Sequence, residues 1–128
     1  MKPKLNIIET PNGNDCWCRA ISLATQQPYN KIYKLLSPFK AKNGGLYASY
    51  IKAYLYDTCD FSSLTFPDFN VYDVMGLLDT RNNHVVIAID EHILYVHKNI
   101  IYDGSLTDKD LSIVLNSKVN YVAYKEIT

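Results

Sequence analysis

The sequence predicts an α+β fold in which N-terminal helices pack on a small antiparallel sheet. Apolar residues recur at helical spacing in the first part of the chain, and short β-branched and aromatic runs follow from residue 84 onward. Of the 128 residues, 48% are hydrophobic, which is enough to form a real core. We therefore expect one domain over residues 1–128, with the helices before the sheet.

The first helix is predicted over residues 16–25, where apolar residues fall at i, i+3, i+4 and i+7 counted from Trp17. Asn, Asp and Gly precede it, and these residues favour turns and caps over helix interiors. Pro28 suits the first turn of a second helix, which Ser37-Pro38 stops. Similar signals predict further helices over residues 46–56, 71–78 and 107–115.

The strands are predicted from short runs bounded by turn residues. Three consecutive runs, over residues 84–89, 92–96 and 99–103, indicate an antiparallel meander. A short strand over residues 63–66 and a closing strand over residues 121–126 complete the expected sheet. The loop over residues 42–45 contains two glycines and is expected to flank a cleft.

Composition argues against several classes of function. The chain carries 13 basic and 13 acidic residues, a formal net charge of +0, so electrostatic binding to nucleic acid is not favoured. No apolar run is long enough to cross a membrane, and the N-terminus lacks the apolar segment of a signal peptide. Three cysteines without a framework spacing indicate a reducing cytosol.

Cys16 is the candidate nucleophile, because it lies where a polar loop turns into a helix. A thiol at a helix N-terminus faces unpaired backbone N–H groups and the positive end of the helix dipole, a setting that stabilises thiolates in general. A base and an orienting acid are then expected downstream. His84 opens the meander and Asp103 closes its third strand, so we predict a Cys16–His84–Asp103 triad, with Asp90 as the alternative acid.

This order of residues resembles the papain-like cysteine peptidase superfamily. Asn14-Asp15-Cys16 followed by Arg19-Ala20 is similar to small phage and bacterial peptidase-like proteins and to bacteriocin-leader peptidases. The stretch around Cys16 also resembles the nucleophile motif of ovarian-tumour-type deubiquitinases. The resemblance covers the N-terminal part of the chain and residues 82–106. It implies a papain-like fold, hydrolysis of a peptide or isopeptide bond without a cofactor or metal, and a bacterial or phage-infected host cytosol.

One departure from the papain-like pattern concerns the oxyanion hole. Members of the superfamily usually carry a Gln before the nucleophile, whereas here Thr10 stands six residues before Cys16 and no Gln precedes it. A side-chain amide can serve the same purpose. We therefore expect Asn14 or Asn12 to act with the backbone N–H of Cys16.

The other cysteines and histidines have simpler interpretations. Cys18 lies about 200° around the helix from Cys16, so the pair cannot easily hold one metal, and Cys-x₂-Cys spacing for zinc is absent. We expect Cys18 and Cys59 to be core residues. His92 and His97 flank a strand and are expected to be exposed.

Three classes of function remain open. The first is a thiol hydrolase acting on a protein or peptide through an acyl-enzyme. The second is an acyltransferase or deamidase with the same triad, which delivers the acyl group to another acceptor. The third is a non-enzymatic protein that binds a host factor on the same scaffold, which the missing Gln and the 11 tyrosines favour.

Overall fold

The computed structural model describes residues 3–7, 15–64, 68–90, 92–103 and 110–127. Within these residues the protein is a mixed α+β structure with one six-stranded sheet. The helices are α1 (Cys16–Thr25), α2 (Tyr29–Leu36), α3 (Ala48–Ala53), α4 (Val71–Leu77) and α5 (Leu111–Leu115), with a 3₁₀ turn η1 (Ser37–Phe39) and a π-helical turn η2 (Tyr54–Thr58). The strands are β1 (Lys4–Ile7), β2 (Ser62–Leu64), β3 (Asn83–Ile89), β4 (His92–His97), β5 (Ile100–Asp103) and β6 (Val119–Glu126).

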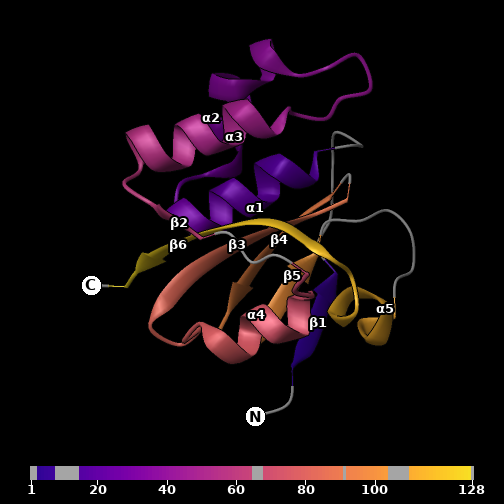
Figure 1. The fold of residues 1–128 in the computed structure, drawn as a ribbon. Helices are drawn as coiled ribbons and strands as arrows, with labels where there is room; N and C mark the ends of the chain where they lie inside the picture. The colour runs from indigo at the N-terminus through magenta and orange to yellow at the C-terminus, as the bar shows by residue number, and fades with distance from the viewer. Residues whose placement is uncertain (1–2, 8–14, 65–67, 91, 104–109, 128) are drawn as a thin grey trace.

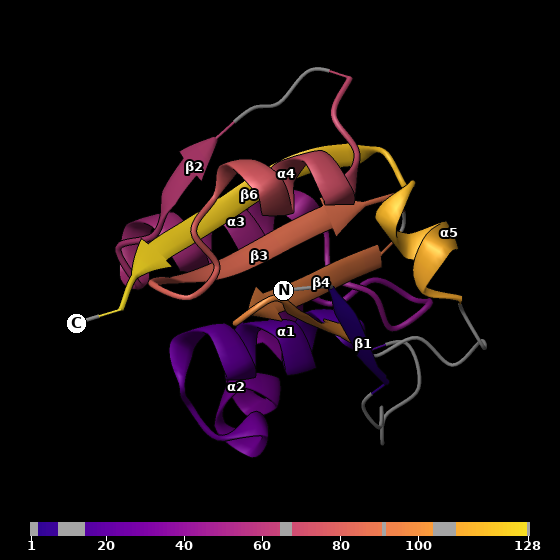
Figure 2. The same ribbon diagram turned by 90° about the horizontal axis from the view of Figure 1, so that it is seen from below.

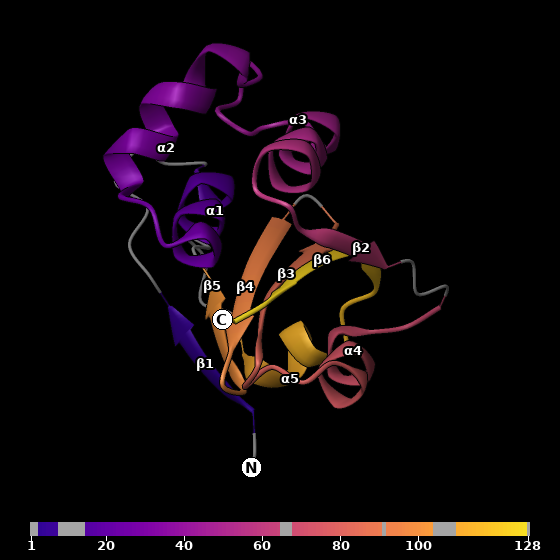
Figure 3. The same cartoon turned by 90° about the vertical axis from the view of Figure 1, so that its left-hand side faces the viewer.

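The sheet has helices on both faces, as Figures 1 and 3 show. Helices α1, α2 and α3 cover one face, and α4 and α5 cover the other. The strand order is β1-β5-β4-β3-β6-β2. Every neighbouring pair is antiparallel except β1 and β5, which run parallel. Figure 2 shows β1 and β2 at the two edges of the sheet. The predicted sheet was wholly antiparallel and lacked β1, so the expectation is corrected at the β1 edge.

Because helices cover both faces of the sheet, the protein has two hydrophobic layers. Alternate residues of the central strands point into one layer or the other. Val86 and Ala88 of β3 face the layer under α1, whereas Val85 and Ile87 face the layer over α4 and α5. This is why β3 has buried residues at nearly every position, in place of the apolar–polar alternation of a half-exposed strand.

Several sequence signals worked as expected. The predicted first helix matches α1 residue for residue. Asn70 caps α4 by accepting from the backbone N–H of Asp73, whose carboxylate accepts from the Asn70 N–H in return. The predicted third helix is displaced, since α3 begins at Ala48 and continues into η2 as far as Thr58.

A tight turn fixes the pairing of β4 with β5. The two residues of this turn, Lys98 and Asn99, have φ values of 50° and 62°. Positive φ at both positions is characteristic of the two-residue hairpin turn that matches strand twist. The turn sets the register in which Asp103 pairs with Leu94, two residues after His92. His92 and Asp103 are therefore diagonal neighbours across the two strands.

Trp17 anchors α1 in the core, because its side chain is only 1% exposed and stacks on Tyr33 at 5.9 Å between ring centroids. Its indole Nε1 donates to the backbone oxygen of Gly44 at 3.0 Å. That bond ties the loop over residues 41–45 to the start of α1. The loop predicted to flank a cleft therefore has a fixed attachment beside Cys16.

Replacing Trp17 with Ala should destabilise the protein by about 3–5 kcal/mol, the usual cost of deleting a large buried aromatic side chain. Urea unfolding followed by circular dichroism measures the loss. The control is Tyr72→Ala, since Tyr72 is 59% exposed and its loss should change stability by less than about 0.5 kcal/mol. Equal losses in the two variants would contradict the anchoring role of Trp17.

Candidate active site

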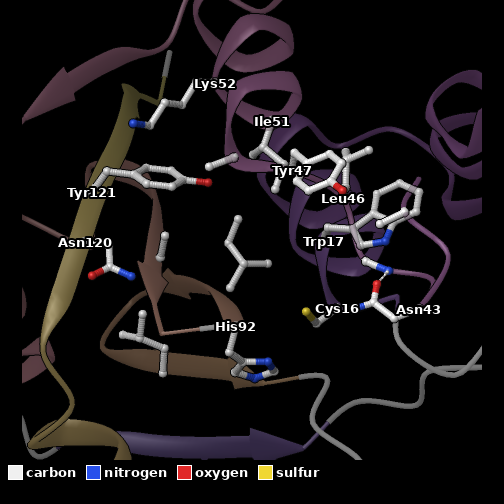
Figure 4. Close-up of a pocket in the computed structure, with 16 residues that line it drawn as sticks. Cys16, Trp17, Asn43, Leu46, Tyr47, Ile51, Lys52, His92, Asn120 and Tyr121 are labelled. Carbon is white, nitrogen blue, oxygen red and sulfur yellow. Dashed lines mark hydrogen bonds between the residues drawn. The ribbon is translucent and has the colours of Figure 1, made fainter. Parts of the chain in front are cut away.

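Cys16 opens α1 and lines a cavity of about 620 Å³. The cavity lies between the start of α1, the loop and helix over residues 41–52, and the ends of β3, β4 and β6. His92 lines the same cavity, and Figure 4 shows the Cys16 sulfur above the His92 ring. Cys16, the nucleophile predicted from the sequence, thus lies in a cleft with a histidine beside it.

The histidine at this cleft is His92, and the prediction of His84 is wrong on geometry. His92 Nε2 is hydrogen-bonded to Asp103 Oδ1. His84 lies at the opposite end of β3, where its Nδ1 is 2.7 Å from the Tyr95 hydroxyl and its side chain lines a different pocket. Asp103 closes β5 as predicted, and the histidine that it contacts is His92.

Strand direction explains the difference. In a meander the first and third strands run the same way, so the start of β3 and the end of β5 lie at opposite ends of the sheet. The start of β4, by contrast, lies next to the end of β5. The signal that identifies His92 is a histidine at the start of the second strand of the meander, with an acid at the end of the third.

The His92–Asp103 pair is well shielded from water. The exposed fraction of the side chain is 10% for His92 and 0% for Asp103. Burial by itself would lower the pKa of His92, but the hydrogen bonds to Asp103 and Cys16 and the electrostatic interactions with these two groups outweigh it. The pKa of His92 is raised to about 9. His92 is therefore an imidazolium at neutral pH, and the expectation that it is exposed is wrong.

His84 has the opposite electrostatics. Burial, with the positive charges of His97 and Lys125, lowers its pKa. Its ring is also stacked with Tyr95 and lies 5.5 Å from the His97 ring. His84 is thus a neutral histidine held by Tyr95 at a strand end, which is a structural role.

The remaining cysteines differ from Cys16 in their surroundings. Cys18 is fully buried, and burial, with the nearby charge of Asp15, raises the pKa of its thiol to about 12. Cys59 is half-buried beside His84, and burial likewise raises its pKa. The core role expected for Cys18 is confirmed, whereas Cys59 lies at the edge of the core.

The structure also describes three further residues named in the sequence analysis, Asp15, Arg19 and Asp90. Asp15 precedes α1 and is buried, and its carboxylate accepts a hydrogen bond from the Tyr29 hydroxyl. Arg19 lies over the Tyr29 ring at 4.5 Å from the ring centroid. Asp90, the alternative acid, is exposed in the turn after β3. Asp103 is therefore the acid that the structure brings to His92.

The predicted oxyanion donors Asn14 and Asn12 lie outside the described residues. The backbone N–H of Cys16 is at the first position of α1, where helical N–H groups have no partner within the helix. The sequence prediction missed other cavity-lining polar groups, namely Asn43, Lys52, Asn120 and Tyr121.

Among the described residues, no group of three or more His, Cys, Asp or Glu side chains is placed to hold a metal ion. No helix in the described part of the chain is both long and apolar enough to cross a membrane. Comparisons with protein-family models, curated proteins and solved structures found no significant match. The chemistry of the site is therefore inferred from its own residues.

The raised pKa of His92 predicts a specific pH dependence of stability. A folded-state pKa of about 9, above the ordinary 6.5, means that the imidazolium stabilises the fold fully below pH 6.5. That contribution is lost as the pH rises through about 9. The stability advantage of the wild type over His92→Gln should therefore shrink between these values in urea unfolding at stepped pH.

The matched control for this measurement is His84→Gln. Because the pKa of His84 is lowered, its contribution changes below pH 6.5 and stays constant above it. If the stability advantage of the wild type over His92→Gln stays constant from pH 6.5 to about pH 9, His92 is not an imidazolium in the folded protein.

Proposed function

We propose that this protein is a papain-like cysteine hydrolase that cleaves a peptide or isopeptide bond, with Cys16 as nucleophile, His92 as acid and base, and Asp103 as the group that orients His92. The observation that carries the proposal is the arrangement of these three side chains, in which a buried carboxylate holds one nitrogen of an imidazole that lies beside a thiol at a helix N-terminus. The proposal keeps the family suggested by the sequence and replaces His84 in its triad.

Electrostatics support this assignment of roles. An imidazolium next to a thiol favours the reactive thiolate form of cysteine in general. The Asp103 carboxylate compensates the His92 charge in a site that water hardly reaches. Asp103 engages Nε2, so Nδ1 is the ring nitrogen left to exchange a proton with Cys16 and the substrate.

The reaction then follows from the positions of the groups. The Cys16 sulfur forms a bond to the carbonyl carbon of the substrate, and the carbonyl electrons move to oxygen. The backbone N–H of Cys16 donates to that oxyanion. Collapse breaks the C–N bond, and the imidazolium of His92 gives its proton to the leaving amine. Neutral His92 next accepts a proton from water, which attacks the thioester and releases the acid and the thiolate.

An acyltransferase or deamidase would share every step up to the thioester. An acyltransferase differs from a hydrolase in that another nucleophile, in place of water, attacks the thioester, and a deamidase differs in that the amide it cleaves is a Gln side chain. Hydrolysis is the simpler proposal because water is always present.

A binding function is the second candidate, and a specific observation favours it. Three neighbouring aromatic side chains are exposed by 42% to 62%, namely Phe39, Tyr47 and Tyr50, and of these Tyr47 lines the cavity. Phe39 and Tyr50 stack at 5.2 Å between ring centroids. Exposed aromatic residues are typical of protein contact surfaces. They are equally suited to hold a protein substrate in front of Cys16.

Thiol reactivity separates an enzyme from a binding protein. With limiting iodoacetamide at pH 6, Cys16 should be alkylated before Cys18 and Cys59, as read by peptide mass spectrometry. His92→Ala should slow alkylation of Cys16 at least about tenfold, since the charge that favours the thiolate is removed.

His84→Ala is the matched control, because it removes a buried histidine of the same sheet that does not face Cys16. It should leave the alkylation rate of Cys16 within about twofold. Preferential labelling of Cys59, or equal slowing in both variants, would overturn the proposed nucleophile and base.

A further inference from the structure

The wall of the cavity opposite Cys16 is built by β6 and α3 (Figure 4). On β6 the pairing with β3 shifts between Ala88 and Ile89, which pair with Tyr121 and Val119 respectively. Asn120 is the extra residue of this bulge. Bulges re-aim side chains and occur next to active sites. Here the bulge places Asn120 and Tyr121 together on the cavity wall.

The Tyr121 hydroxyl is a buried polar group with no hydrogen-bond partner within the described structure. Tyr121 is 8% exposed, and Figure 4 shows its hydroxyl pointing into the cavity. Burial is the main cause that raises the pKa of this hydroxyl, and the nearby Tyr56 and Cys16 raise it further. The hydroxyl is therefore protonated at neutral pH. A buried donor without a partner costs free energy unless a ligand accepts from it.

Lys52 adds a positive charge to the same wall. Its Nζ lies 4.6 Å from the centroid of the Tyr121 ring. Neither of the ion pairs found among the described residues includes Lys52. Among the described residues that line the cavity there is no Asp or Glu. The described part of the wall therefore presents a cation and two groups that can donate hydrogen bonds.

We propose that Lys52, Asn120 and Tyr121 form a substrate subsite for a carboxylate, so that the protein acts on peptides carrying a Glu or Asp side chain near the bond that is cleaved. The proposal rests on the hydrolase function proposed above. An ammonium, a phenol O–H and an amide NH₂ are all donors, and charge-assisted hydrogen bonds to carboxylates are stronger than neutral ones. Among the residues described for this wall, none offers a counter-charge to a cationic substrate group.

Peptidyl vinyl sulfones test the subsite, because the thiol adds to the double bond and forms a stable thioether without hydrolysis. The probes are tripeptides in which Glu, Gln or Lys is placed in turn at each position. The measured quantity is the second-order rate constant for modification of Cys16. At one position the Glu probe should react at least about tenfold faster than the Gln probe, and the Lys probe should be slowest.

Substitutions on the cavity wall test whether its residues cause the preference for Glu over Gln. Lys52→Met should reduce the Glu-to-Gln rate ratio to about one, and Tyr121→Phe should reduce it partly. Lys34→Met is the matched control, since Lys34 is exposed on α2 away from the cavity. It should keep the full ratio. The subsite is refuted if Glu is preferred at no position, or if Lys52→Met retains the preference.

A binding measurement separates failure of the subsite from failure of the hydrolase proposal. The only tryptophan, Trp17, lines the cavity, so its fluorescence can report binding of a blocked Glu or Gln tripeptide to Cys16→Ala. Tighter binding of the Glu peptide, lost in Cys16→Ala/Lys52→Met, supports the subsite even if Cys16 proves unreactive. Equal binding of the two peptides overturns it whatever the reactivity of Cys16.

Discussion

The carboxylate of Asp103 is completely buried, and the architecture of the site follows from the need to compensate it. A buried anion without a partner is strongly unfavourable, whereas a buried anion next to an imidazolium is tolerated. The two-residue turn at Lys98 and Asn99 provides that partner, because it fixes the register that brings His92 beside Asp103. The imidazolium then sits where α1 begins, next to Cys16.

The two histidines at opposite ends of the sheet show how environment sets the role of a residue. His92 and His84 are both largely buried, and burial alone lowers the pKa of both. His92 faces a carboxylate and a thiol, which reverse the effect, whereas His84 faces a tyrosine hydroxyl and positive groups, which do not. Only the first arrangement yields a charged ring that can give up a proton during a reaction.

Much of the fold could be predicted because it depends on local signals. The polar loop before Cys16 and the periodic apolar residues after it identify α1, and Asn70 marks the start of α4. Strand β1 was missed because it is four residues long and gains its place only by pairing with β5, about a hundred residues away in the sequence. Its parallel pairing has no local signature.

The types of residue that form the site could be predicted from the sequence, whereas the histidine that pairs with Asp103 was predicted wrongly. Cys16 and Asp103 carry local signals, a helix start and a strand end. Choosing between His84 and His92 requires the direction of each strand, which follows once the hairpin at Lys98 and Asn99 is considered. The subsite depends on a bulge at Asn120 and on Lys52 of α3, two segments far apart in the sequence that only tertiary packing brings together.

Cys16, His92 and Asp103 are coupled electrostatically, and the protonation state of His92 reports this coupling. The measurement is the imidazole ¹⁵N chemical shifts of all three histidines by NMR at pH 7.5, in the wild type and in Asp103→Asn. In the wild type both ring nitrogens of His92 should carry a proton and His84 should be neutral. In Asp103→Asn, His92 should become neutral. A neutral His92 in the wild type, or an imidazolium that persists in Asp103→Asn, would show that Asp103 does not set the charge of His92.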